Sequence, residues 1–189
     1  MISSLKLALV GALGLLNLVP VPILAAQGSL PCNGEKLPAP VNELLKSKFG
    51  NWRPKQLSDM EADDQQLWLT GPNNKECPGI AIGHFENAEN LSYVLLLVPK
   101  SNSSGGHRIV VFSKDLTKDL YASKLLDHAE GQSYSGLVIS KVGPDKYKDW
   151  EGAKSINLKL DGLLVEWLEK GALLYYWSVD RFKKLQVSD

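Results

Sequence analysis

The sequence of 189 residues has few of the side chains that build metal centres and reactive sites, with only two cysteines and three histidines. His84, His107 and His128 stand too far apart for a local metal site, and no C-x-x-C pair accompanies them. The chain also lacks the G-x-S-x-G motif that marks the nucleophile of α/β-hydrolases. We therefore predict no metal, no cofactor and no motif-based catalytic residue, and we favour a protein that is not an enzyme.

An excess of charge of either sign is also missing. The chain has 21 basic and 21 acidic residues and no net charge at pH 7. Binding to nucleic acid or to an anionic membrane surface draws on a basic excess, because the partner's phosphates must be neutralised. We therefore expect neither of these partners.

The first residues have the order of a secretory signal peptide. One basic residue, Lys6, precedes an apolar run from Leu7 to Val19, and small residues stand before the expected cut after Ala26. A positive start, a short apolar core and small residues at the end are typical of segments that signal peptidase removes. We predict a signal peptide over 1–26 and a single exported domain over 27–189.

A membrane anchor and a lipoprotein are the alternatives to a cleaved leader. A spanning helix needs about 20 apolar residues, but Asn17, Pro20 and Pro22 interrupt this run. Lipid attachment calls for a small residue directly before the cysteine, whereas Pro31 precedes Cys32. We therefore expect no stable membrane anchor after cleavage, and a secreted or periplasmic location.

The two cysteines, Cys32 and Cys77, are the natural partners of one disulfide. An exported chain reaches an oxidising compartment, and no third thiol competes for the pairing. Closing a loop of about 45 residues stabilises a fold by on the order of 4 kcal/mol in the chain-entropy model. We predict a disulfide that stabilises the fold and has no redox role.

The helical period occurs twice near the N-terminus. Over 41–49 the apolar residues fall on one face, which predicts an amphipathic helix. Ser58 and Glu61 have the spacing of a capping box, which predicts a second helix from there to about Trp68.

From Cys77 onward the period changes to that of β-strands, with short turns between them. Asp161-Gly162 has the composition of a two-residue hairpin turn, and Lys170-Gly171 of a second turn, so the C-terminal strands should form a four-stranded meander. We predict an α+β fold, with the N-terminal helices packed on a curved antiparallel β-sheet or partly closed barrel of roughly seven to nine strands. The expected strands are 80–85, 92–98, 108–112, 121–126, 135–140, 155–160, 163–167, 172–177 and 182–187.

Three consecutive aromatic residues, Tyr175, Tyr176 and Trp177, occupy one expected strand. Successive side chains of a strand point to opposite faces, so Tyr175 and Trp177 should share a face and Tyr176 should take the other. One of these faces belongs to the core, and the other exposes aromatic surface of the kind that interfaces favour.

The segment from Cys77 to Asn87 resembles small exported bacterial proteins of unknown function, whose central loop is similar to the FG-GAP repeat. In that repeat a G-D-F-N-G-D-G loop joins two strands and binds calcium through aspartate and asparagine oxygens. His84 stands at the first acid of the pattern and Glu86 at the asparagine, so the resemblance implies a strand–loop–strand unit without the full calcium ligand set. The ending from Tyr175 to Asp189 looks like the ending of the same group.

The sequence thus favours an exported protein that binds another protein or an envelope component, for example as an inhibitor or immunity-type protein. Its binding surface would be a sheet face or the loops 84–92 and 101–107. The alternative is a secreted hydrolase whose site is assembled from separated residues, with His84 or His128 as the base. The residues expected to form the binding surface are His84, Glu86, Asn87, Tyr175, Tyr176 and Trp177.

Overall fold

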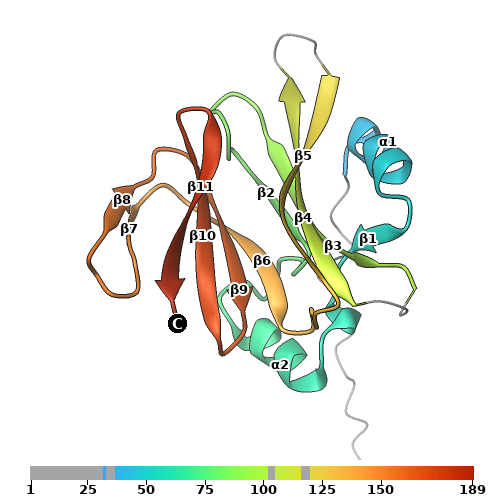
Figure 1. The fold of residues 1–189 in the computed structure, drawn as a ribbon, viewed down its shortest axis with the longest axis horizontal. Coiled ribbons are helices and arrows are strands. Elements are labelled where there is room, and N and C mark those ends of the chain that lie inside the picture. Colours follow the sequence, from blue (N-terminus) through green and yellow to red (C-terminus); the bar gives the residue numbers. More distant parts are fainter. Residues whose placement is uncertain (1–31, 33–36, 102–104, 116–119) are drawn as a thin grey trace, which may run out of the picture.

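The computed structural model describes Cys32 and residues 37–101, 105–115 and 120–189, so the predicted signal peptide lies outside the described residues. The described part is built mostly from antiparallel β-strands, with two α-helices (Figure 1). Its elements are α1 (Ala39–Lys48), β1 (Trp52–Pro54), the 3-10 helix η2 (Leu57–Asp59), α2 (Ala62–Thr70), β2 (Ile80–Gly83), β3 (Ser92–Pro99), β4 (Gly106–Asp115), β5 (Leu120–Glu130), β6 (Leu137–Val142), β7 (Lys146–Lys148), β8 (Ser155–Asn157), β9 (Gly162–Trp167), β10 (Gly171–Ser178) and β11 (Arg181–Ser188).

Two antiparallel sheets pack face to face, and one core lies between them. The N-terminal sheet has the order β1-β3-β4-β5, with β2 also paired to β3, and the C-terminal sheet has the order β11-β10-β9-β6 (Figure 1). Alternate residues of each strand point to the facing sheet, and these are the apolar ones. The buried side chains of this core are Ala81, Phe85, Val94, Leu96, Ile109, Val111, Leu137, Ile139, Leu163, Val165 and Tyr175.

This arrangement confirms the helix-plus-antiparallel-sheet class but corrects the single curved sheet or partly closed barrel. The ladder of the N-terminal sheet ends at β5, and the chain then crosses to the other layer. There β6 pairs with β9 and not with its sequence neighbour β5. Among the described strands the sheet is therefore split in two and does not close.

The first helix is confirmed, whereas the second begins later than its capping-box pattern predicted. Helix α1 covers the outer face of the N-terminal sheet with its apolar side. Ser58 lies in η2, and α2 starts only at Ala62. Asp59 takes part in the capping of η2, so the residues around Ser58 form this short helix and not the first turn of α2. The Asp59 carboxylate accepts two bonds of 2.6 Å from Arg53 and one of 2.7 Å from the Gln56 N–H. The capping box that forms joins Gln56 and Asp59 and lies at the N-terminus of η2.

The predicted hairpin at Asp161-Gly162 is wrong. Strand β8 pairs with β7, whereas β9 pairs with β6 and β10, so only β9, β10 and β11 form the meander. Asp161 is instead tied to the N-terminal sheet: its carboxylate accepts the His84 N–H at 2.8 Å, and its own N–H donates to the His84 carbonyl at 3.2 Å. The turn at Lys170-Gly171 is confirmed, between β9 and β10.

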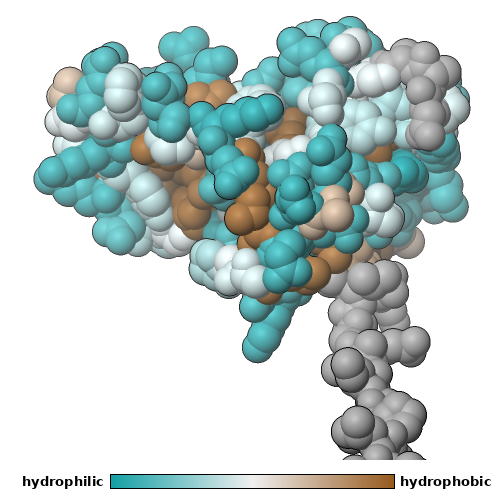
Figure 2. All heavy atoms as spheres, turned by 90° about the horizontal axis from the view of Figure 1, so that it is seen from below, coloured by the Kyte–Doolittle hydropathy of each residue, from teal (hydrophilic) through white to brown (hydrophobic). Residues whose placement is uncertain are grey.

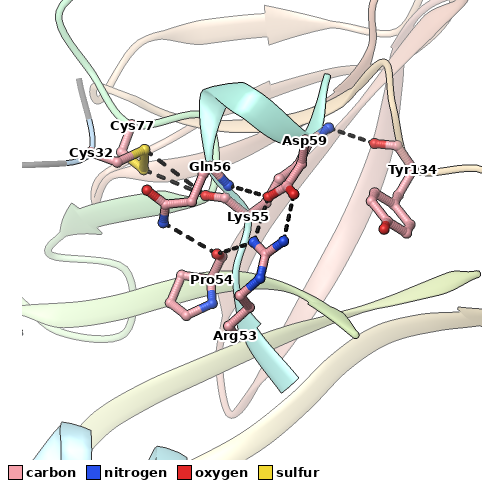
Figure 3. A network of polar contacts seen from close by, with 8 residues as sticks. All are labelled: Cys32, Arg53, Pro54, Lys55, Gln56, Asp59, Cys77 and Tyr134. Carbon is pink, nitrogen blue, oxygen red and sulfur yellow. Dashed lines mark hydrogen bonds and ion pairs between the residues drawn. A yellow bond between two sulfur atoms is a disulfide. The ribbon is translucent and has the colours of Figure 1, made fainter. Parts of the chain in front are cut away.

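The backbone of Lys55 fills the gap between β1 and β2 at the edge of β3. Its N–H donates to the Leu96 carbonyl at 2.8 Å, and the Leu96 N–H donates to the Gly79 carbonyl at 2.9 Å. The predicted disulfide between Cys32 and Cys77 is present, and its sulfur atoms lie 3.9 and 3.7 Å from the Lys55 carbonyl oxygen (Figure 3). The disulfide therefore fastens Cys32 to this junction.

The side chain of Lys55 crosses to the C-terminal sheet. Lys55 is fully buried, and its ammonium donates to the carbonyls of Tyr134 at 2.5 Å, of Leu137 at 2.6 Å and of Ser135. Three N–H donors thus meet three acceptors at the start of β6 and just before it, so one residue joins both sheets. Figure 3 shows the bond to Tyr134. Burial lowers the pKa of Lys55 to about 7, against a smaller opposing effect of Asp59 and Asp64.

Lys55 should make the stability of the fold depend on pH. Its pKa is about 7 in the fold and 10.5 in a free chain, so between these values the unfolded chain holds a proton that the folded chain has released. The free energy of unfolding should then rise by about 2 kcal/mol from pH 7.5 to 9.5. In urea unfolding, Lys55→Met should lose this rise, and Lys183→Met, at an exposed position, should keep it. An unchanged rise in Lys55→Met would contradict the assignment.

Gly79 is required because the Lys55 backbone lies against it. A Cβ at Gly79 would touch the Lys55 carbonyl oxygen and lie 2.8 Å from the Lys55 nitrogen, whereas a Cβ at Gly143 would meet nothing within 4 Å. We expect Gly79→Ala to lower the free energy of unfolding by about 3 kcal/mol, as overpacking does. Gly143→Ala should stay near the wild type in the same unfolding curves, and equal stability of both variants would count against the junction.

Candidate binding surface

Three segments that are distant in the sequence meet at one end of the two sheets: the loop 84–91, strand β5 and the hairpin of β10 and β11 (Figure 1). Lys124 of β5 joins them. Its ammonium lies 3.0 Å from a carboxylate oxygen of Glu86 and 4.6 Å from the ring centroid of Trp177. Glu86, Asn87, Lys124 and Trp177 all line one hollow of 540 Å³, and we call these four residues the Trp177 surface.

The alternation of β10 places its aromatic residues as follows. Tyr175 points into the core between the sheets and is buried, so it does not belong to the surface. Trp177 shares that face but lies beyond the end of the core, half-exposed. Phe182 stands opposite it on β11, with the ring centroids 5.1 Å apart in an edge-to-face arrangement. Such aromatic pairs stabilise a hairpin end beyond the area they bury.

Tyr175 has a polar partner inside the protein. Its hydroxyl donates to a carboxylate oxygen of Asp127, which lies on β5 of the facing sheet. Burial raises the pKa of Tyr175, and the hydrogen bond and negative charge of Asp127 raise it further. The pair is therefore a second polar link between the two sheets, close to the Trp177 surface.

Tyr176 takes the other face of β10, as the alternation predicts. It lines a second hollow, of 460 Å³, together with Asn157, Asp161 and Trp177. Because Asp161 holds the backbone of His84, this hollow adjoins the start of the loop 84–91. The His84 Nδ1 is buried and makes no hydrogen bond with the described residues.

Asn87 and Glu86 use their oxygens within the protein. The Asn87 side-chain oxygen accepts the N–H groups of Glu89 at 3.0 Å and Asn90 at 2.8 Å, which closes the turn of the loop. Glu86 is nearly buried beneath Lys124, with 10% of its side chain exposed. Within the described ranges no group of three or more His, Cys, Asp or Glu side chains could hold a metal ion.

The three histidines lie apart from one another. His107 is buried on β4, where burial lowers its pKa, and His128 is exposed on β5. In the part of the chain that the structure describes, no imidazole hydrogen-bonds a Ser, Asp or Glu side chain. The described residues thus do not supply the hydrogen bond between a histidine and a Ser, Asp or Glu side chain that the hydrolase hypothesis requires.

The second predicted loop, 101–107, lies partly outside the described residues, at 102–104. Its described ends adjoin the end of β3 and the start of β4, at the opposite end of β3 from Ser92, where the loop 84–91 enters. The described residues of 101–107 do not line the hollow of the Trp177 surface.

Sequence reasoning missed Lys124 and Phe182. Phe182 carried a usable signal, because the expected strands 172–177 and 182–187 are neighbours in the meander, and Trp177 and Phe182 face each other at their adjoining ends. Lys124 carried none, since its contact with Glu86 joins residues 38 positions apart in separate segments.

The opposite end of the molecule, at the turn between β9 and β10, has a different character. Hydrophobic side chains gather there in a hollow between hydrophilic ones (Figure 2). Beside that turn a hollow of 270 Å³ is lined in part by Trp167, Ala172 and Leu173. Leu69 on α2, 41% exposed, contacts none of the Trp177 surface and offers a control position.

The adjacent tyrosines of β10 should differ sharply in their effect on stability. Tyr175→Phe removes the donor to Asp127 and leaves one oxygen of that carboxylate without its partner, so we expect a loss of about 2 kcal/mol in the free energy of unfolding. Tyr176→Phe should change it little, because the Tyr176 hydroxyl makes no hydrogen bond within the described ranges of the chain. Thermal and urea unfolding of both variants measure this, and a cost for Tyr175→Phe no larger than for Tyr176→Phe would contradict the link.

None of the described helices is long and apolar enough to cross a membrane. Comparisons of the chain with protein-family models, with curated proteins and with solved structures find no match. The interpretation of the Trp177 surface therefore rests on its own geometry and chemistry.

Proposed function

We propose that the chain is an exported, non-enzymatic binding protein and that the Trp177 surface is where its partner docks. One observation carries this proposal. Lys124 contacts Glu86 and Trp177 at once, and so fixes the loop 84–91, β5 and the β10–β11 hairpin in one arrangement. A surface held in place before binding loses little conformational entropy when a partner arrives.

The side chains have the chemistry of a protein interface. Trp177 combines a large apolar ring with a polar N–H, and tryptophan is enriched among the residues that dominate binding energy. Lys124 is half-exposed, so its charge is available to a partner at the rim, where charges guide association and specificity. The hollow that these residues line gives a partner's side chain a place to enter.

The disulfide supports the proposed location. Disulfides form and persist outside the reducing cytosol. The bond between Cys32 and Cys77 is compatible with an oxidising compartment, where an envelope component or another exported protein would be met. An inhibitor or immunity-type protein is one concrete form of this function.

Loss of the Trp177 ring should weaken binding. The purified chain, immobilised, is exposed to the exported and envelope fractions of the source cells, and retained material is quantified. We expect Trp177→Ala to retain at least tenfold less than the wild type, because removal of a central aromatic side chain costs about 2 kcal/mol or more. Lys124→Met, which keeps the aliphatic stem, should also reduce retention.

The control is Leu69→Ser, which changes an exposed apolar side chain at the other end of the molecule. It should retain as much as the wild type, and unfolding curves of all variants establish that each is folded. Equal retention by the wild type and by folded Trp177→Ala would refute the proposed surface.

A further inference from the structure

Val179 is the most exposed of the exposed large hydrophobic residues that the structure describes, with 93% of its surface accessible. It occupies the tip of the β10–β11 hairpin, between the paired residues Ser178 and Arg181. Most of an aliphatic side chain is thus offered to solvent at the end of a protruding turn, adjacent to the Trp177 surface.

The backbone at Val179 is strained. Its φ is 64°, in the left-handed region that β-branched residues rarely adopt, and the Asp180 N–H donates to the Ser178 carbonyl at 2.9 Å across it. Glycine or asparagine would fit this turn without that strain. Residues held in such conformations concentrate at sites that bind ligands or partners.

The turn is braced immediately behind its tip. Trp177 and Phe182 face each other across the two strands, and the Lys124 ammonium lies 4.6 and 5.8 Å from their ring centroids. Val179 is therefore presented on a fixed base, so that inserting it into a pocket orders few additional groups.

The charges around the tip are mainly positive. Asp180 and Arg181 are both exposed and lie 4.0 Å apart, so they largely balance each other. Lys124 is paired with Glu86, and the hollow of the Trp177 surface is also lined by one residue of each sign, Lys114 and Asp115. The excess of positive charge comes from Lys183 and Lys184, both exposed on β11. A partner would thus meet an aliphatic anchor bordered by cations, which an acidic rim complements.

We propose that Val179 is an anchor that inserts into an apolar pocket of a protein partner whose rim is acidic. This inference rests on the proposed function and names its partner. A second copy of the chain fits less well, because two tips that meet would bring the same lysines together. A polysaccharide offers no apolar pocket for an aliphatic side chain.

The test separates strain from contact by substitutions at one position. Val179→Gly removes both, so we expect its melting temperature to rise by about 3 °C, as relief of a left-handed residue does, while retention of the partner falls at least tenfold. Val179→Thr keeps the branched shape and the strain but replaces one methyl group with a hydroxyl, so its melting temperature should stay unchanged while retention falls. Val179→Ile should bind as well as the wild type.

A photo-crosslinking residue at position 179 of the full chain identifies the partner in the exported and envelope fractions. We expect one protein adduct at 179, competed by unlabelled wild type, and none from the same residue at 69. The adduct should map to an apolar pocket with acidic neighbours, and retention should fall as salt is raised. Adducts between copies of the chain, or equal retention on protease-treated envelope, would overturn the proposal.

The two proposals fail in different ways. If folded Val179→Gly retains the partner fully while Trp177→Ala loses it, the anchor is refuted and the Trp177 surface stands. If the wild type retains nothing, or Trp177→Ala retains as much as the wild type, the proposed function is refuted and the anchor with it.

Discussion

The buried side chain of Lys55 makes the contacts on which the two-sheet arrangement depends. Its backbone completes the edge of the N-terminal sheet opposite Leu96, and its side chain holds the carbonyls that lead into β6. A buried cation is costly unless its donors are satisfied, and here three carbonyl oxygens meet the three donors. The bond from the Ile139 N–H to the Pro78 carbonyl, at 2.9 Å, adds a backbone link at the same seam. The disulfide fastens Cys32 to the same point. One junction therefore sets how the two sheets face each other.

This constraint extends to the proposed binding end through β2. That strand begins directly after Gly79, which lies against Lys55, and it ends at the loop that carries Glu86. Asp161 fixes the start of the loop, and Lys124 fixes Glu86 against Trp177. The first part of the loop is therefore held by both sheets, at His84 and at Glu86. The N-terminal junction and the binding end are joined by a short, rigid strand, which accounts for how an irregular loop can form part of a defined surface.

Local patterns in the sequence were informative where the physics is local. Hydrophobic periodicity located α1 and most strands, and the alternation of β10 placed Tyr175 with Trp177 and Tyr176 opposite. Sequence patterns predicted the wrong structure where a side chain binds a partner outside its own turn or strand. Asp161 has the composition of a hairpin turn but binds the backbone of His84, and Asp59 pairs with Arg53, so α2 starts after the predicted cap. Lys55 reads as an ordinary surface lysine, because its three acceptors lie about 80 residues away. For the same reason Lys124 could not be assigned to the surface, and the strain at Val179 has no signature in composition.

The two-sheet arrangement depends on the Lys55 side chain being buried between the sheets, and the titration of that single side chain tests this burial most directly. Chemical shifts of the ¹³Cε atoms in a chain labelled at lysine, assigned with the Lys55→Met variant, follow each ammonium through its own pH midpoint. We expect a midpoint for Lys55 near 7. A Lys55 resonance that titrates near the value of a free lysine, about 10.4, would show a solvated side chain and contradict the bridge.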